Sequence, residues 1–294
     1  MTLRRTRRAI DHFLSSLARP EKLVILNQAG RASPSDTRLC LFSHFDLRDH
    51  VSPYVFYHLE RLRELGADIV FISTCASLPA PDLDRLKGLC IRVVLRKNLS
   101  LDFGSWKIGL GVGPELSRYD QLILANDSVY GPFFPLAPIF EKMNGQGCDF
   151  WGITSTTEIR PHIQSYFLVF SPRAFLSEAF KKFWEDFRYY RSKARIIENY
   201  ELGFSMLAQK EKWKTGAYVE STQLRSQGPH INPTLHAWKE LIEEWKCPFL
   251  KTEVLRLNRT ASPDVREWAQ ILAKQSTYPI EQIREHLSCL PSKR

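Results

Sequence analysis

Short apolar runs alternate with stretches of helical periodicity in the first half of the chain. The runs have strand length and lie at residues 39–42, 69–72, 91–95 and 121–125. Between the first two runs, apolar residues recur at spacings of three or four over residues 49–65, and Gly66 follows as a helix stop. Helices are also predicted for residues 82–89 and from about Gly104. This alternation predicts an α/β fold with a mostly parallel twisted sheet flanked by helices.

The second half of the chain has a less regular pattern. Residues 150–153 and 166–170 are predicted strands, and residues 173–190, 195–212 and 265–274 are predicted helices. The helix at 173–190 carries an apolar stripe at a spacing of four, formed by Phe175, Ala179, Phe183 and Phe187. A stripe of this kind is typical of core packing, and we predict that role for it.

The pattern divides the chain into three parts. Residues 1–37 are predicted to be a basic arm and linker, because residues 31–36 are rich in turn-forming residues. Residues 38–258 hold the predicted α/β domain, and residues 259–294 a C-terminal helical tail.

Charge is concentrated at the N-terminal end. The chain has 294 residues and a net charge of 41 − 32 = +9. Residues 1–23 hold six Arg or Lys residues against two acidic ones, together with apolar residues at helix-compatible spacings. Two interpretations remain open: a helix that lies on an anionic membrane surface, or a solvated leader helix packed on the domain.

The six cysteines and the apolar runs bear on location. The cysteines are scattered without a Cys-x-x-Cys pair, which argues against a structural zinc site and a disulfide-stapled domain. The chain has no apolar stretch near the roughly 20 residues that span a bilayer, and its first residues lack the apolar core of a signal peptide. We therefore expect a cytoplasmic protein with a peripheral contact at the inner face of the cell membrane.

Polar residues follow the predicted strands, where ligands bind in parallel α/β sheets. His44 and Asp46 follow the first strand. Arg96 and Lys107 flank Asp102, which stands where a helix begins. Cations and free N–H groups at such a position suit a diphosphate, but Asp102 as a simple N-cap explains the pattern equally well.

Asn126, Asp127 and Ser128 follow the fourth strand. A carboxylate directly after a buried strand is placed to hold a hard divalent cation, Mg²⁺ or Mn²⁺, with nucleotide phosphates completing the coordination shell. The alternative is a turn, because all three residue types favour turns through bonds to their own backbone.

Glu201 is the candidate general base. It shares one face of the helix predicted for residues 195–212 with Ile197, Tyr200 and Phe204. A carboxylate among apolar neighbours tends towards the raised pKa that a base working near neutrality needs. A structural Glu paired with an Arg is the alternative, and the sequence does not separate the two.

Several segments together resemble the rhamnan synthesis protein F family of glycosyltransferases. The resemblance runs in order, at similar spacing, over roughly residues 38–258. It rests on residues 43–46 (SHFD), 96–107 (RKNLSLDFGSWK), 122–132 (LILANDSVYGP), 149–154 (DFWGIT), 162–170 (HIQSYFLVF), 232–234 (NPT) with Trp238, and 248–251 (PFLK). The chain departs from the family pattern at residues 99–101, where Leu-Ser-Leu replaces an expected x-Gly-Tyr.

The resemblance implies a GT-A-like fold and transfer of a deoxyhexose, typically rhamnose, to a growing bacterial surface polysaccharide. The implied donor is dTDP-rhamnose and the implied acceptor a lipid-linked glycan; no organic cofactor is expected. In this interpretation Glu201 is the base of an inverting displacement, and Asp127 holds the donor diphosphate with or without a metal ion. The remaining donor-binding candidates are His44, Asp46, Arg96, Asp102, Lys107, Asn126 and Ser128. The candidates for acceptor or sugar binding are Trp151, His162, Gln164 and Tyr166.

Two other functions compete with this prediction. A non-catalytic glycan-binding or scaffold subunit of the same pathway would not bind a nucleotide sugar. A nucleic-acid-binding protein would explain the basic character, but the basic excess is concentrated in the arm and no nucleic-acid motif is present.

Overall fold

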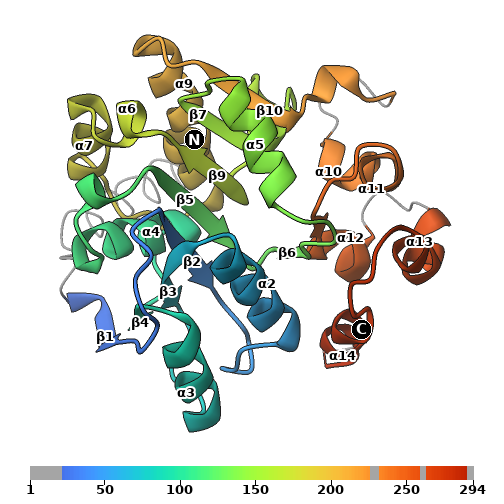
Figure 1. The fold of residues 1–294 in the computed structure, drawn as a ribbon, viewed down its shortest axis with the longest axis horizontal. Helices are drawn as coiled ribbons and strands as arrows, with labels where there is room; N and C mark the ends of the chain where they lie inside the picture. The colour runs from blue at the N-terminus through green and yellow to red at the C-terminus, as the bar shows by residue number, and fades with distance from the viewer. Residues whose placement is uncertain (1–21, 226–231, 259–262, 290–294) are drawn as a thin grey trace, which may run out of the picture.

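The computed structural model describes residues 22–225, 232–258 and 263–289. The predicted basic arm, residues 1–23, falls outside this part of the chain except for its last two residues. Within the described residues, the α/β prediction is confirmed: a large sheet lies between two layers of helices (Figure 1). No helix of the described residues combines the length and apolar character that crossing a membrane requires.

The central sheet of the described chain has the strand order β1-β4-β3-β2-β5-β9-β7-β10, with β8 paired to β7. β2, β3, β4, β5, β7 and β10 run in one direction, whereas β1, β8 and β9 are antiparallel to their neighbours. The strands are β1 Val24–Ala29, β2 Arg38–His44, β3 Ala67–Ser73, β4 Arg92–Arg96, β5 Gln121–Asn126, β7 Phe150–Thr156, β8 His162–Ile163, β9 Phe167–Phe170 and β10 Thr215–Val219. The six parallel strands therefore present their carboxyl ends at one edge of the sheet.

β1 corrects the prediction that the arm and linker run uninterrupted to residue 37. Val24–Ala29 pairs antiparallel with β4 at the edge of the sheet. The sequence conceals this strand because an edge strand with half-buried and exposed positions lacks the continuous apolar run of its neighbours.

Helices cover both faces of the sheet, and alternate residues of one strand enter different cores. In β2, Leu39 and Leu41 join the core beneath one helix layer, whereas Cys40 and Phe42 join the other. The first layer contains α4 Leu101–Val112, α6 Pro172–Phe175, α7 Glu178–Glu185, α8 Lys193–Ile196 and α9 Leu202–Lys210. The second contains α2 Pro53–Glu64, α3 Ala80–Leu89, α5 Ala137–Gly145, α10 Pro233–His236 and α11 Trp238–Glu243.

Two predicted helices are broken in the structure. The helix predicted for residues 173–190 is α6 followed by α7, because Ser177 ends the first turn and caps α7 by accepting a hydrogen bond from the Phe180 N–H. The core role of the aromatic stripe is confirmed: Phe175 is buried, and Phe183 and Phe187 pack against the core while half-buried. The buried aromatic residues of α7 are Phe180 and Trp184, which lie outside the predicted stripe. The helix predicted for residues 195–212 consists of α8, a π-helical turn at Ile197–Glu201 and α9.

The C-terminal segments pack against the domain rather than extending from it. β11 Leu250–Lys251 pairs with β6 Val129–Tyr130, and α12 Thr252–Leu257, α13 Trp268–Gln275 and α14 Glu281–Ser288 follow. The Tyr130 hydroxyl lies 2.7 Å from Nδ1 of His286, which is a buried residue of α14. This contact joins the end of the described chain to the loop that follows β5.

Candidate functional site

A cavity of about 650 Å³ opens at the carboxyl edge of the parallel strands. Its floor comes from residues that follow β2 and β5, and its walls from α4, the β7–β8 loop, the π-helical turn, α12 and α14. Twelve of the residues that line it are charged residues or histidines, in addition to several amides and hydroxyls: Asp46, Arg48, Asp102, Asp127, Glu158, His162, Lys193, Glu201, Lys251, Glu253, Arg256 and His286. The volume lies within the range of ligand sites, and the lining suits a polar, charged ligand.

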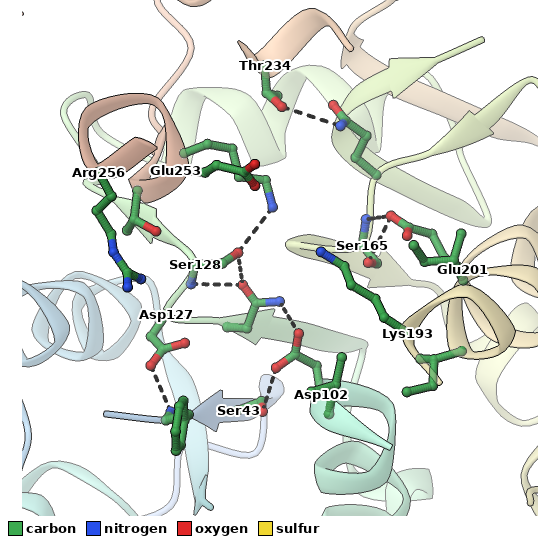
Figure 2. Close-up of a pocket in the computed structure, with 18 of the residues that line it drawn as sticks. Ser43, Asp102, Asp127, Ser128, Ser165, Lys193, Glu201, Thr234, Glu253 and Arg256 are labelled. Carbon is green, nitrogen blue, oxygen red and sulfur yellow. Dashed lines mark hydrogen bonds between the residues drawn. The ribbon is translucent and has the colours of Figure 1, made fainter. Parts of the chain in front are cut away.

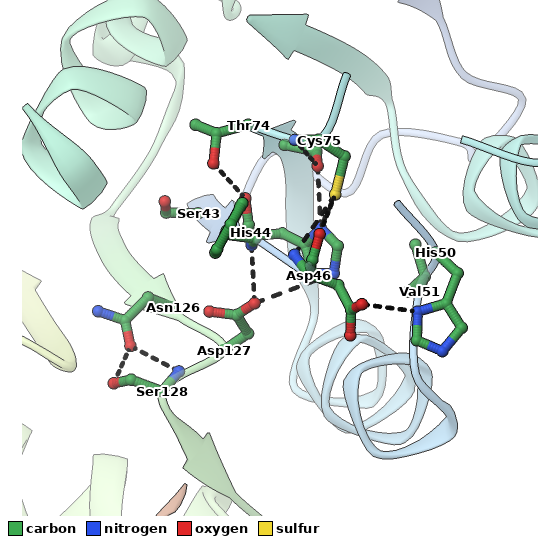
Figure 3. Close-up of polar contacts among 12 residues, drawn as sticks. Ser43, His44, Asp46, His50, Val51, Thr74, Cys75, Asn126, Asp127 and Ser128 are labelled. Carbon is green, nitrogen blue, oxygen red and sulfur yellow. Dashed lines mark hydrogen bonds and ion pairs between the residues drawn. The ribbon is translucent and has the colours of Figure 1, made fainter. Parts of the chain in front are cut away.

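Asp127 lies at the centre of the cavity floor (Figures 2 and 3). Its Oδ2 accepts a hydrogen bond from the Phe45 N–H at 2.8 Å, and the Tyr54 hydroxyl donates to its carbonyl oxygen at 3.0 Å. Burial, together with the negative charges of Asp102 and Asp46, raises the pKa of Asp127 to about 8. A carboxyl group held in this way gains from a cationic partner in the cavity.

Asp102 connects two other residues of the cavity floor through hydrogen bonds. Its two oxygens accept hydrogen bonds from the Ser43 hydroxyl at 2.9 Å and the Asn126 amide at 3.0 Å (Figure 2). Burial raises the pKa of Asp102, while the Ser43 hydrogen bond and the charge of Lys251 oppose that shift. Asn126 in turn accepts from the backbone N–H and hydroxyl of Ser128. Asn126, Asp127 and Ser128 therefore form the turn that the sequence allowed, and the same three residues line the cavity.

His44 and Asp46 flank Asp127 on the side of β2 and β3 (Figure 3). His44 is buried, with Nδ1 2.9 Å from the Ser73 hydroxyl and Nε2 3.9 Å from Oδ2 of Asp127. Burial lowers the pKa of His44 to about 3, so the ring is neutral at neutral pH. Asp46 lines the cavity and accepts from the Arg48 N–H at 2.7 Å. His44 therefore packs behind the cavity floor and does not line the cavity, whereas Asp46 lines it.

Glu201 faces the same cavity from the π-helical turn. Its Oε1 accepts hydrogen bonds from the Ser165 N–H and hydroxyl, both at 3.0 Å (Figure 2). Among the described residues, Oε2 has no hydrogen-bond partner. The structural alternative predicted an Arg partner, but the hydrogen bonds that hold the Glu201 carboxylate come from Ser165. A π-turn is common at functional sites because it re-aims side chains within a helix.

Four cations that the sequence did not assign to the site line the cavity: Arg48, whose Nε lies 3.5 Å from Oδ1 of Asp46, and the three cations Lys193, Lys251 and Arg256. Lys251 donates to the Ser128 hydroxyl at 3.1 Å and lies 4.7 Å from the centre of the Tyr166 ring. Burial lowers the pKa of Lys251, and the negative charges of Glu201 and Asp102 raise it. The sequence indicated Lys251 only as part of the family-like segment at residues 248–251. That segment did not show that Lys251 would lie beside Ser128, which follows β5.

Of the four residues proposed for sugar binding, two line the cavity and two lie behind its wall or in the core. His162 and Gln164 line the cavity, and Gln164 donates to Oδ1 of Asn232 at 3.1 Å. Tyr166 lies behind the cavity wall, where its hydroxyl is 2.9 Å from the Thr154 hydroxyl. Trp151 does not reach the cavity: it is 1% exposed and packs edge-to-face on Phe140. The prediction that Trp151 binds sugar is wrong, because its position on β7 points it into the core.

The donor-binding assignments of Arg96 and Lys107 are also wrong. Arg96 is fully buried and donates to the Ser105 hydroxyl and to the carbonyl oxygens of Lys97, Leu99 and Leu101. Lys107 lies on a different surface, in a groove beside α7. Both were adjacent to the site in sequence, but α4 carries Lys107 one and a half turns away from its first residue.

Arg96 explains the departure from the family pattern at residues 99–101. Ser100 and Leu101 have positive φ angles of 65° and 48°, a conformation that favours the glycine expected at position 100. Arg96 holds this loop through its carbonyl oxygens, and the Ser100 N–H donates to the Tyr190 carbonyl oxygen at 3.0 Å. Backbone hydrogen bonds therefore maintain the turn without glycine.

Replacing Arg96 with Lys is expected to lower the melting temperature without changing the increase that a bound donor produces. Lysine offers three donors on a flexible stem and cannot reproduce the planar fork that serves four acceptors. The buried carbonyl groups left unpaired cost about 2–4 kcal/mol, or on the order of 5–10 °C. Thermal melts of R96K and of R92K, a matched change on the same strand, test this. A selective loss of donor binding with an unchanged melt would restore the original assignment.

The described residues include no group of three or more His, Cys, Asp or Glu side chains arranged to hold a metal ion. Both oxygens of Asp102 already accept hydrogen bonds, so Asp102 is a poor ligand. Asp127 is the candidate that the sequence proposed, and the structure places it facing the cavity.

The fold and cavity define an α/β protein with a charged, ligand-sized site at the carboxyl edge of its sheet. The chain belongs to the rhamnan synthesis protein F family, whose model matches residues 69–293. The family resemblance recognised from the motifs is confirmed. Virulence protein VirA of Vibrio anguillarum (strain ATCC 68554 / 775) is 27% identical over 208 residues, covering 60% of this chain and 66% of VirA. The uncharacterized protein y4gN of Sinorhizobium fredii (strain NBRC 101917 / NGR234) is 27% identical over 153 residues, covering 50% of this chain and 40% of y4gN. The matches thus span less than two thirds of either relative.

Two solved structures resemble the fold at low sequence identity. A protein of Desulfovibrio desulfuricans G20, assigned as a nucleotide-diphospho-sugar transferase, is 12% identical with a TM-score of 0.40, covering 82% of this chain and 98% of that one. The galactosyltransferase LgtC, solved with donor and acceptor sugar analogues, is 10% identical with a TM-score of 0.42, covering 84% of this chain and 99% of that one.

Proposed function

We propose that this protein is a nucleotide-sugar-dependent, GT-A-like glycosyltransferase that transfers a deoxyhexose, rhamnose, to a growing bacterial surface polysaccharide. Membership of the rhamnan synthesis protein F family supports the glycosyltransferase assignment. The observation that carries the proposal is the joining of Asp127, Glu201 and three cations around one cavity of about 650 Å³. A donor diphosphate needs cations, and an acceptor hydroxyl needs a base, within the same enclosed space.

The proposed donor site is the floor of the cavity. Lys193, Lys251 and Arg256 replace the predicted cations Arg96 and Lys107 as partners of the diphosphate. Asp127 faces the same space, where burial and the negative charges of Asp102 and Asp46 raise its pKa to about 8, and a cation beside it would favour its charged form. Mg²⁺ is commonly bound by one or two carboxylates plus substrate phosphates, so a divalent ion shared between Asp127 and the donor fits this residue set. Such an ion would neutralise charge on the leaving diphosphate.

Glu201 would act on the acceptor. Its Oε2 would take the proton from the acceptor hydroxyl as that oxygen attacks the anomeric carbon and the bond from that carbon to the diphosphate oxygen breaks. The electron pair of the broken bond leaves with the nucleoside diphosphate, whose charge the three cations stabilise. Attack from the face opposite the diphosphate inverts the anomeric configuration.

Donor binding is expected to raise the melting temperature of the protein, because a ligand that binds the folded state alone stabilises it. A screen of dTDP-rhamnose, UDP-glucose and GDP-mannose, each with and without Mn²⁺, measures this effect. We expect the largest increase with dTDP-rhamnose, about 2.7 kcal/mol of added stability at 100 times the dissociation constant. No increase with any nucleotide sugar would favour the non-catalytic scaffold instead.

A further inference from the structure

Exposed apolar side chains gather around the mouth of the cavity. The large apolar residues of the described chain that are at least 36% exposed number eight, and five of them line this cavity. These five are Phe45 at 46%, Leu47 at 69%, Leu101 at 41%, Ile159 at 60% and Leu257 at 36% exposure. We call them the apolar rim. Scattered single apolar residues are ordinary on a protein surface, but a concentration at one opening marks an interaction site.

The apolar rim is assembled from four separate segments. Phe45 and Leu47 follow β2, Leu101 begins α4, Ile159 lies between β7 and β8, and Leu257 ends α12. These segments are brought together by the sheet, since they lie at the carboxyl ends of its strands or pack against them. Because no single segment is apolar throughout, the rim has no counterpart in the sequence pattern.

The cationic and acidic side chains that line the cavity differ in their exposure to solvent. Of the charged residues that line it, those that are exposed are the cations Arg48, Lys193 and Arg256. The six carboxylates that line it are all less exposed: Asp46, Asp102, Asp127, Glu158, Glu201 and Glu253. Figure 2 shows Arg256 and Lys193 on opposite sides of the carboxylates of Asp102 and Asp127. The outer ring is thus apolar and cationic, whereas the interior is acidic.

We propose that the apolar rim and the exposed Arg48 beside it form a membrane-contacting surface, which seats the mouth of the cavity on a bilayer containing anionic lipids. Lys193 and Arg256, which the proposed function assigns to the donor diphosphate, add positive charge near this surface. Apolar side chains that enter the headgroup boundary, together with Lys and Arg beside them, are the combination that binds such a surface. The inference rests on the proposed function in one respect: the acceptor then reaches Glu201 directly from the membrane.

The bilayer explains features that a soluble donor does not. A diphosphate accounts for cations, but it gives no reason for Leu47 and Ile159 to remain 69% and 60% exposed beside a polar cavity. The contact is also distinct from the predicted membrane contact of residues 1–23, because every residue of the rim belongs to the folded domain. Substitutions in the apolar rim and deletion of residues 1–23 therefore test the two membrane contacts separately.

Cosedimentation of the full-length protein with vesicles tests the proposal. Vesicles of phosphatidylcholine with 30% phosphatidylglycerol are compared with vesicles of phosphatidylcholine alone. The variant L47S/I159S removes the two most exposed rim residues. The control I25S/M206S removes two apolar residues that are more than half exposed and do not line the cavity. We expect wild type and I25S/M206S to bind the anionic vesicles alike, and L47S/I159S to bind them at least about tenfold more weakly, which corresponds to 1.4 kcal/mol.

Three results would overturn the proposal. Wild type could fail to bind anionic vesicles, or L47S/I159S could bind them as well as wild type, which would assign the contact to another part of the chain. Light scattering could instead show that wild type self-associates through the rim and that L47S/I159S abolishes this, which would make the partner a second copy. Donor-induced thermal stabilisation is measured in parallel. It should persist in L47S/I159S, so failure of the membrane inference is distinguishable from failure of the glycosyltransferase proposal.

Discussion

Replacing Asp127 with Asn should abolish sugar transfer and, at the same time, raise the melting temperature of the unliganded protein. The loss of transfer follows from the position of the carboxylate on the cavity floor, where it faces the proposed donor site. The gain in stability follows from its pKa, which burial and two neighbouring carboxylates raise from 3.8 to about 8. Asparagine keeps an oxygen to accept the Phe45 N–H hydrogen bond and removes the unfavourable charge.

The stability difference should depend on pH in a defined direction. A carboxyl group whose folded pKa exceeds its unfolded pKa binds more protons in the folded state, so wild type loses stability as the pH rises between the two values. Asparagine does not titrate. The advantage of D127N should therefore be absent near pH 4, grow as the pH rises and level off above about pH 8. The full difference between the two pKa values corresponds to at most about 6 kcal/mol. We expect the plateau to reach at least about 1–2 kcal/mol, or about 2–8 °C.

Melts of wild type and D127N from pH 4 to pH 9, with turnover and donor binding measured at pH 7.5, test both parts. D186N, which changes an exposed carboxylate at the end of α7 that does not line the cavity, serves as the control and should leave the melts and turnover unchanged. Mn²⁺ with donor should stabilise wild type more than D127N if the two share an ion. Normal donor binding and turnover by D127N would remove Asp127 from the site, and a pH-independent difference would contradict the electrostatic explanation.

Replacing Glu201 with Gln should lower kcat by roughly 10²–10⁴-fold, the usual effect of removing a general base. Glutamine retains the oxygen that accepts from Ser165, so the side chain keeps its position and loses only its basicity. The dissociation constant of the donor and the melting temperature should change much less than kcat, because Glu201 acts on Lys251 of the proposed diphosphate site through its charge alone, without a hydrogen bond or ion pair among the described residues.

Glu198 provides a matched control for this experiment. It lies three residues earlier in the same π-helical turn, is exposed and does not line the cavity. E198Q should therefore turn over like wild type. If E201Q were destabilised but retained near-normal turnover per folded molecule, Glu201 would be structural. If both variants lost activity equally, the effect would belong to the helical turn rather than to the carboxylate.

Local sequence patterns were sufficient for the elements of the first half of the chain. The four apolar runs that predicted β2, β3, β4 and β5 are buried strands, and their parallel arrangement follows from the helices between them. The same alternation located Asn126, Asp127 and Ser128 at the carboxyl edge, because position after a buried strand is a property of the chain itself. Glu201 was also found from the sequence, as a carboxylate on an otherwise apolar helix face.

The sequence alone determined the fold class, the family and those residues lining the cavity that follow strand ends. Tertiary structure decided which nearby charges reach the cavity. Arg96 and Lys107 were neighbours of the site in sequence, yet one is buried beneath a loop and the other lies on a separate surface. Lys251 is distant from Ser128 in sequence, but its Nζ lies 3.1 Å from the Ser128 hydroxyl once β11 pairs with β6. The physical reason is that periodicity reports whether a side chain faces the core or solvent, whereas contact between distant segments depends on strand pairing and helix packing, which no local pattern encodes.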